Sequence, residues 1–185
     1  MLEIIGSLVN IDRAIFFFIN TSLANPVTDF IMPMITTDLH LKIFYGLCLA
    51  LILWKGDNRL RIAILFSLAA IALTDQISAS VIKPIFARPR PCSNLDVHLL
   101  VGCGSGFSFP SSHAANLFGQ AYLFRVIKPG FAKFLIPLAI VVALSRVFVG
   151  VHYPIDIIVG AALGTIIGFC VGYIFIRLID KKKMI

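Results

Sequence analysis

Charged residues are scarce in this sequence: Asp, Glu, Lys and Arg make up only 14% of its 185 residues. A soluble domain of that length needs a larger polar fraction to cover its surface. Hydrophobic residues account for 59% of the chain, and the mean hydropathy is +0.96. The composition therefore excludes an ordinary soluble domain and predicts a polytopic membrane protein folded as one compact bundle.

Acidic residues are the rarer charge, with 9 Asp and Glu against 16 Lys and Arg, and the formal net charge is +7. A basic balance can indicate nucleic-acid binding, but such binding needs a water-facing cationic surface. Here the basic residues lie at the ends of apolar runs, and the sequence contains no nucleic-acid-binding module. We therefore expect no nucleic-acid partner and interpret the positive charge as a signal of orientation in the membrane.

Cysteines are few as well, and the spacing of the four residues matches no metal site. Cys48 and Cys170 lie inside apolar runs, whereas Cys92 and Cys103 flank a polar loop. Spacing alone does not show whether two Cα atoms are close enough for a bridge. The sequence therefore leaves two alternatives for the second pair, a disulfide and two free thiols.

Five apolar runs have the character of membrane-spanning helices, and they cover residues 39–54, 62–82, 113–124, 134–149 and 155–176. A helix needs ~20 residues to cross the hydrocarbon layer. The shorter runs must therefore continue past these limits, or their ends must lie where the bundle shields them. These runs predict an all-α bundle with residues 39–178 as its main part and residues 179–185 as a basic tail.

The N-terminal region, residues 1–38, is amphipathic. Apolar residues recur at three- and four-residue spacing in residues 1–24, where Glu3, Asp12 and Arg13 interrupt them. We expect no cleaved signal peptide, because a clean apolar core and a small-residue cleavage pattern are both missing. The first interpretation is an interfacial helix, and the alternative is a sixth span with a buried charge pair. The predicted fold is thus a polytopic transmembrane bundle of five to six spans.

The basic residues also predict the orientation of this bundle. Alternation of five spans places three segments on one side of the membrane, and these segments hold ten of the 16 Lys and Arg residues: Lys55, Arg59, Arg61, Arg125, Lys128, Lys133, Arg177 and Lys181 to Lys183. The positive-inside rule makes that side, and the C-terminus with it, cytoplasmic.

Four cations lie in the opposite loops, where the orientation rule gives no reason for them: Lys83, Arg88, Arg90 and Arg146. As a group they predict that an anion binds on the outer side. For any single one of them, the alternative is a partner among lipid phosphates or in Asp96 or Asp156.

The outer segments also contain three motifs, which are Lys83-x6-Arg90-Pro91, Pro110-Ser111-Ser112-His113 and Ser145-Arg146-x5-His152-x3-Asp156. Each motif alone is weak, because short patterns of common residues recur by chance. In this order and on one predicted side of the membrane, they resemble the signature of the phosphatidic acid phosphatase type 2 superfamily, which includes bacterial lipid phosphatases and vanadium haloperoxidases. Only Ser112 departs from the signature, because the family has glycine there.

The resemblance implies a role for each matched residue. His152 would be the nucleophile that forms a phosphohistidine, and Asp156 would orient it. His113 would protonate the leaving lipid oxygen and then deprotonate a water molecule. The phosphate would be bound by Lys83, Arg90, Ser111, Ser112 and Arg146.

The physical chemistry of the residues agrees with these roles. Phosphoryl transfer needs cations around the phosphate oxygens, a nucleophile in line with the breaking bond and an acid for the leaving oxygen. His152 and Asp156 are four residues apart, and Pro154 between them suits a first helical turn, so both side chains should share one face. An Asp bonded to one ring nitrogen leaves the other nitrogen free to attack phosphorus.

The resemblance therefore implies an integral membrane lipid phosphatase that needs no metal or organic cofactor and that vanadate should inhibit. The candidate substrates are undecaprenyl diphosphate, phosphatidylglycerol phosphate, lipid A 1-phosphate and phosphatidic acid, in that order of preference. The enzyme would lie in a bacterial inner membrane with its active site facing the periplasm or the outside. The alternative is a non-catalytic protein that binds or transports a lipid phosphate, although binding alone needs no nucleophile with an orienting acid.

The last apolar run contains a stripe of glycines at four-residue spacing, formed by Gly160, Gly164, Gly168 and Gly172. Such a stripe permits close packing of helices. Packing against neighbouring helices of one subunit is the preferred interpretation, and a dimer face is the alternative. The sequence leaves the oligomeric state open.

Overall fold

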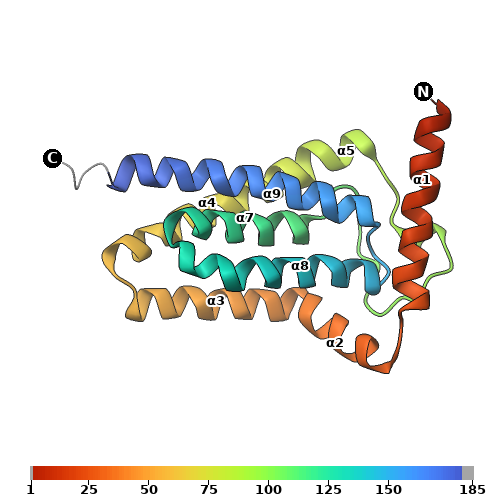
Figure 1. The fold of residues 1–185 in the computed structure, drawn as a ribbon, viewed down its shortest axis with the longest axis horizontal. Helices are drawn as coiled ribbons and strands as arrows, with labels where there is room; N and C mark the ends of the chain where they lie inside the picture. Colours follow the sequence, from red (N-terminus) through yellow and green to blue (C-terminus); the bar gives the residue numbers. More distant parts are fainter. Residues whose placement is uncertain (1, 181–185) are drawn as a thin grey trace.

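The computed structural model describes residues 2–180, with side chains from residue 6 onward, and all regular structure in this part of the chain is helical. The predicted all-α class is thereby confirmed. Five long helices run side by side, and they are α3 (Asp38–Lys55), α4 (Asn58–Asp75), α7 (Ser112–Ile127), α8 (Ala132–Phe148) and α9 (Pro154–Phe175) (Figure 1). Most of the predicted basic tail lies outside the described residues.

Shorter elements complete the fold. The α-helical ones are α1 (Leu2–Phe17), α2 (Pro26–Thr36), α5 (Lys83–Phe86) and α6 (Pro91–Asn94). The π-helical segments η1 (Phe18–Ser22), η2 (Gln76–Ile82) and η4 (Ile176–Asp180) extend α1, α4 and α9, and the 3₁₀ turn η3 (Pro129–Phe131) precedes α8.

Three stretches of the described chain are long and apolar enough to span a membrane, and they are Asn58–Asn94, Pro129–Phe148 and Pro154–Asp180. The other two long helices fall short for physical reasons. The 18 residues of α3 include Asp38, Lys42 and Lys55, and α7 has only 16 residues. Because α7 packs against α4, α8 and α9, half of its 16 residues are buried by protein and do not need to meet lipid.

The N-terminal helix α1 lies crosswise to the long helices at one end of the bundle (Figure 1). It exposes Leu8, Ile11 and Ile15, whereas Asp12 and Phe16 are buried. The segments Gly6–Ser22 and Pro26–Thr36 are together long and apolar enough to form one more span, but they are bent by 113° relative to each other. An apolar exposed side on a helix that crosses the bundle end favours the interfacial helix over a sixth straight span.

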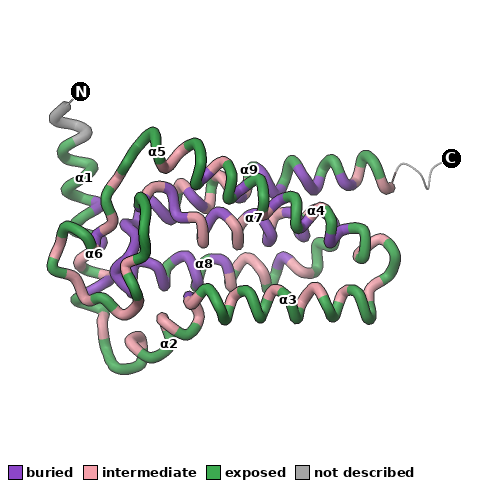
Figure 2. The backbone as a smooth tube through the Cα atoms, turned by 180° about the vertical axis from the view of Figure 1, so that it is seen from behind, coloured by how far each residue is buried: buried purple, intermediate pink, exposed green. Residues whose placement is uncertain are grey.

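The core lies between α7 and α9, where the glycine stripe brings the two backbones together. A Cβ atom on Gly164 would lie 2.0 Å from the Ala115 carbonyl oxygen, and one on Gly168 would lie 2.3 Å from that of Gly119. The stripe therefore packs helices of one subunit, as preferred from the sequence. Buried residues gather along α7, α8 and α9, whereas α3 has none (Figure 2).

Candidate active site

The three motifs meet at the end of the bundle that α1 crosses. The contacts that join them are a hydrogen bond from Lys83 Nζ to the Pro110 carbonyl oxygen (2.9 Å), one from the Ser111 N–H to the Asp156 carbonyl oxygen (3.0 Å), and a 3.4 Å contact between Arg90 Nη1 and His152 Nε2. Each motif is thus tied to the other two. The folded chain brings together residues that are up to 73 positions apart in these three segments, from Lys83 to Asp156.

His152 lies in the turn between α8 and α9 and is 2% exposed. Gly150 makes this turn possible, because its φ of 84° falls in the left-handed region that favours glycine. Burial lowers the pKa of His152 to about 3, Asp156 opposes this shift, and the positive charges of Arg90 and Arg146 add to it. The imidazole is therefore neutral around pH 7.

The contacts of the His152 ring assign its tautomer. An arginine side chain can only donate hydrogen bonds, so the contact with Arg90 makes Nε2 an acceptor without a proton. The proton then lies on Nδ1, which is 3.5 Å from Asp156 Oδ2 and 3.3 Å from Ser108 Oγ. This tautomer leaves the lone pair of Nε2 on the side of the cations.

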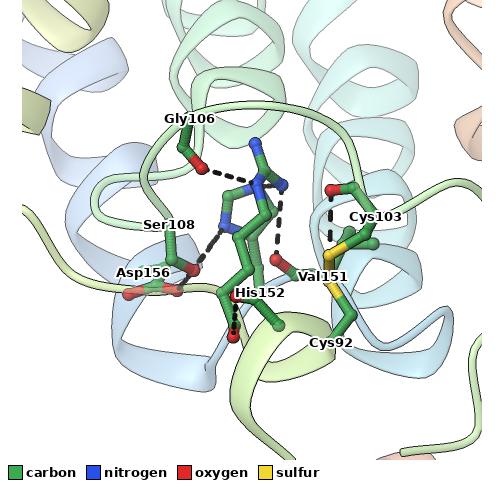
Figure 3. The surroundings of a disulfide bond; sticks show 9 residues. Cys92, Cys103, Gly106, Ser108, Val151, His152 and Asp156 are labelled. Carbon is green, nitrogen blue, oxygen red and sulfur yellow. Dashed lines mark hydrogen bonds and ion pairs between the residues drawn. A yellow bond between two sulfur atoms is a disulfide. The ribbon is translucent and has the colours of Figure 1, made fainter.

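Ser108 is a site residue that the sequence motifs missed. Its hydroxyl donates a hydrogen bond to Asp156 Oδ2 and lies beside His152 Nδ1, so it links the two side chains (Figure 3). Its backbone N–H donates to the Arg88 carbonyl oxygen at 2.7 Å, which fixes its position. No pattern in the sequence marks it, because it lies in a glycine-rich stretch outside all three motifs.

Asp156 is fully buried in the first turn of α9. Its Oδ2 atom accepts a hydrogen bond from the Tyr153 N–H at 2.8 Å and so caps the helix. Its Oδ1 atom accepts one from Arg88 Nη1 at 2.7 Å. Arg88, one of the four unexplained outer cations, therefore takes the aspartate partner that the sequence offered as an alternative to an anion.

Arg146 lies near the end of α8 and is only 9% exposed. Its Nη1 atom donates to both the carbonyl and hydroxyl oxygens of Thr36, at 3.2 and 2.9 Å. Its Nε atom is buried and has no hydrogen-bond partner among the described residues. A buried N–H of a charged group without a partner costs stability, and an anion is the species that would satisfy it.

His113 lies in the first turn of α7, where its Nε2 atom is 2.9 Å from Asp38 Oδ1. The charge of Arg146 acts on both His113 and His152. Asp38, in the first turn of α3, is a second polar neighbour that the motifs did not reveal.

The two serines of the second motif differ in their contacts. Ser111 is buried as the residue before α7, and its hydroxyl accepts a hydrogen bond from the Ala114 N–H at 3.5 Å. The Ser112 hydroxyl is instead 3.1 Å from that of Ser78 in η2. The structure thus directs the Ser112 side chain toward η2, and only its backbone N–H, at the start of α7, remains suited to an anion.

A disulfide closes the loop beside these residues. Cys92 and Cys103 are bonded, and their Cα atoms are 5.8 Å apart, which decides between the two alternatives that the sequence left open. The bond lies beside His152 (Figure 3). It joins the chain next to Arg90 to the chain next to Gly106, whose carbonyl oxygen accepts a hydrogen bond from Arg90 Nε at 3.2 Å.

Two adjoining cavities open from His113 along α3. The first has a volume of about 320 Å³, and its lining includes Asp38 and Asp75 together with several apolar residues. The second has a volume of about 260 Å³ and is lined by apolar side chains except at Tyr45, Cys48 and Gln120. Four residues line both cavities, and they are Leu41, Tyr45, Leu117 and Gln120. The predicted proton donor therefore lines the first of two adjoining cavities, and the second cavity is the more apolar one.

Two solved structures share this fold. A transmembrane PAP2-type phosphatidylglycerolphosphate phosphatase from Bacillus subtilis superposes with a TM-score of 0.72 and 23% identity over 93% of this chain and 88% of that one. LpxE from Aquifex aeolicus superposes with a TM-score of 0.66 and 25% identity over 86% of this chain and 93% of that one. Both likenesses extend over nearly the whole bundle.

Sequence comparison identifies the family. A lipid A 4'-phosphatase of Bacteroides thetaiotaomicron is 30% identical over 168 residues, which cover 85% of this chain and 73% of that protein. The undecaprenyl-diphosphatase BcrC of Bacillus subtilis is 31% identical over 161 residues, which cover 86% and 79%. The family model of the PAP2 superfamily matches residues 62–183, the stretch that contains all three motifs and therefore His113 and His152. The chain is therefore a member of the PAP2 superfamily.

Proposed function

We propose that this chain is an integral membrane lipid phosphatase that removes a phosphate through a phosphohistidine at His152. The observation that carries the proposal is the buried guanidinium of Arg146, whose Nε atom has no partner among the described residues and which acts electrostatically on both histidines. A buried cation with a spare donor beside a neutral imidazole suits a dianionic ligand. The relatives, which are lipid phosphatases by name, support the same conclusion.

The phosphate would be held by three cations and one helix terminus. Lys83 and Arg90 approach from the α5–α6 segment, and Arg146 approaches from α8. The charges of Arg90 and Arg146 both act on Lys83, which supports a position of the three cations near one another. The N–H groups at the start of α7, next to Ser111 and Ser112, would supply further donors to the phosphate oxygens. Because these side chains supply the positive charge, we propose that no metal ion is needed.

His152 would attack phosphorus through Nε2. In the free protein this atom accepts from Arg90, so the incoming phosphate must draw the guanidinium to its own oxygens and release the lone pair. Asp156 and Ser108 hold the proton on Nδ1 and stabilise the positive charge that the ring gains on attack. The new bond joins Nε2 to phosphorus, and the bond that breaks joins phosphorus to the leaving oxygen.

His113 would supply the proton that this leaving oxygen takes. Burial and the charge of Arg146 lower the pKa of His113 to about 4 in the free protein, and the Asp38 carboxylate beside its Nε2 acts in the opposite direction. The negative charge of a bound phosphate would add to the effect of Asp38 and favour the protonated form that this step requires. In the second step His113 would take a proton from water, whose oxygen attacks the phosphohistidine and releases inorganic phosphate. For a monoester substrate the products are a lipid alcohol and phosphate, and for a lipid diphosphate they are a lipid monophosphate and phosphate.

The lipid tail would lie along the cavities below His113, of which the second has a mostly apolar lining. The candidate substrates are those given by the sequence, and relatives named for lipid A and for undecaprenyl diphosphate support two of these classes. The site would face the periplasm or the outside, with the C-terminus in the cytoplasm. In support, Arg59, one of the predicted cytoplasmic cations, contacts Asp180 and the C-terminal residue Ile127 of α7 at the other end of the bundle.

The test is phosphate release by the purified protein in detergent micelles from each of the four candidate lipids. His152→Ala should lower kcat by at least about 10³-fold, as expected for loss of a nucleophile. The matched control is His98→Ala, which removes an imidazole that is likewise paired with an aspartate, Asp29 at 3.0 Å, in an outer loop. The control should keep nearly the whole rate.

The same preparation distinguishes the alternatives. A base-stable phosphoenzyme formed from labelled lipid by the wild type, and missing from His152→Ala, would support the covalent step. A His152→Ala variant within tenfold of the wild-type rate would overturn it. Binding of all four lipids without any phosphate release would favour the non-catalytic lipid-phosphate protein, and loss of activity in EDTA that Mg²⁺ restores would contradict metal independence.

A further inference from the structure

The crosswise helix α1 contains a buried carboxylate among mostly exposed residues. Asp12 is 6% exposed, whereas Leu8, Ile11 and Ile15 around it are exposed. A carboxylate buried near the membrane is costly unless it is paired. Asp12 has two partners, Arg88 Nη2 at 2.6 Å and the N–H of Ile155 at 2.9 Å. Both partners belong to segments that carry the candidate active site.

Arg88 connects this carboxylate to the catalytic one. Its Nη2 atom binds Asp12, its Nη1 atom binds Asp156 Oδ1 at 2.7 Å, and its guanidinium carbon lies 3.9 Å from the centre of the Tyr153 ring. The planar guanidinium thus bridges two carboxylates while it stacks on a ring next to His152. The residue before it, Ala87, has a φ of 42°, in the left-handed region that is strained for a residue with a Cβ.

The two oxygens of Asp156 have separate partners. Oδ2 faces His152, Ser108 and the Tyr153 N–H, whereas the hydrogen bond at Oδ1 comes from Arg88. Removal of the guanidinium would leave Oδ1 buried without this donor, and the carboxylate could then rotate away from Nδ1. Asp12 acts on Asp156 indirectly. It holds the Arg88 guanidinium by charge, and it also accepts a hydrogen bond from the first turn of α9, which carries Asp156.

We propose that Arg88 and Asp12 are a positioning pair for the reaction, through which the N-terminal helix α1 holds the carboxylate that orients His152. This inference rests on the proposed function of His152 as nucleophile. Neither residue touches the phosphate, so their loss should slow the chemical step and leave lipid binding nearly unchanged. The pair also gives α1 a part in catalysis beyond contact with the membrane surface.

A purely structural role for Arg88 predicts a different result, and the chain offers a matched control that tests for it. Arg59 forms a comparable ion pair with Asp180 at 2.9 Å, joins three helices at the far end of the bundle and lies far from any motif. If Arg88 only braces the fold, Arg88→Gln and Arg59→Gln should lower the thermal midpoint and kcat in the same proportion. If Arg88 positions Asp156, only the Arg88 variant should lose kcat beyond its loss of stability.

The experiment measures kcat, KM and the thermal midpoint for the wild type, Arg88→Gln, Asp12→Asn, the double variant and Arg59→Gln, on the best lipid of the panel. We expect a loss of kcat of about 10- to 100-fold for Arg88→Gln and about 3- to 10-fold for Asp12→Asn, with KM within about threefold. The double variant should be no slower than Arg88→Gln alone, since Asp12 acts through Arg88. Arg59→Gln should keep kcat within about twofold.

Several outcomes would overturn the proposal. These are a wild-type kcat in Arg88→Gln, multiplied losses in the double variant, and a loss confined to KM. If Arg88→Gln cannot be recovered folded, Asp12→Asn decides alone, because its amide oxygen can still accept from the Ile155 N–H, and an unchanged kcat there refutes the positioning role. A wild type that releases phosphate from no lipid contradicts the proposed function itself, which is a different result from an active enzyme that is indifferent to these two residues.

Discussion

Replacement of Arg146 by Met should separate stability from function. The methionine removes a guanidinium whose buried Nε lacks a partner, which relieves about 1–3 kcal/mol of desolvation cost. It also removes the two hydrogen bonds to Thr36, each of which contributes about 0.5–1.5 kcal/mol, or somewhat more for a charged donor. The two effects have opposite signs and similar size. We therefore expect the unliganded variant to unfold within about 1 kcal/mol of the wild type.

The effect of Arg146→Met on stability should appear when an anion is added. Orthovanadate at about 100 times its Kd should stabilise the wild type by about 2.7 kcal/mol, because it binds only the folded state. Arg146→Met should lose nearly all of this stabilisation together with phosphatase activity. Arg146→Lys keeps the charge but not the forked donors, so it should keep only a small part of both.

The assay is thermal unfolding of the detergent-solubilised protein with and without vanadate, run beside phosphate release. A gain of about 2.7 kcal/mol corresponds to a rise of about 5 °C or more for a chain of this size. Two results would refute the reasoning. One is a vanadate-induced shift in Arg146→Met equal to that of the wild type, and the other is a loss of more than about 3 kcal/mol in the unliganded variant.

Three further predictions concern neighbouring groups. Ser108→Ala should lower kcat by about tenfold with little change in KM, because the hydroxyl bridges Asp156 and His152. An unchanged steady-state kcat would exclude a role for Ser108 in the reaction. Reduction of the disulfide, or Cys92→Ser, should raise KM more than it lowers kcat, because Arg90 is held by the loop that the bond closes. Measurement of activity at increasing dithiothreitol concentrations checks this. Burial lowers the pKa of His152 to about 3 from an ordinary value of 6.5, so the unfolded chain binds the proton more readily. The stability that this group contributes is complete above about pH 6.5 and falls as the pH decreases toward 3. The thermal midpoint of His152→Gln should therefore fall less between pH 7 and 4.5 than that of the wild type. Parallel curves of thermal midpoint against pH for the two proteins would contradict this prediction.

The sequence predicted the helical bundle and its main helices, because runs of apolar residues are a direct requirement of the lipid phase. It understated the length of α7, because Ser112 at its start and Arg125 in its last turn limit the apolar run within its 16 residues. It could not decide between a disulfide and two thiols, because the Cα separation of 5.8 Å depends on the folded loop.

The candidate site was predicted in part. The motif residues converge in the fold, although their roles stay predictions. Ser108 was missed, because its contact with Asp156 joins positions 48 residues apart. Asp12 was seen only as a charge that interrupts an apolar stretch, since its contact with Ile155 spans 143 residues. Such partners cannot be read from spacing within a motif, because they depend on how α1 lies against the bundle.

The backbone contact between α7 and α9 has a consequence for how a substrate arrives. Where a single added methyl group on Gly164 would collide with the Ala115 carbonyl, no hydrocarbon chain can slip between the two helices. The cavities that begin at His113 are instead lined in part by residues of α3. Bulky substitutions on the inner side of α3 should therefore discriminate among lipids by tail thickness rather than by headgroup.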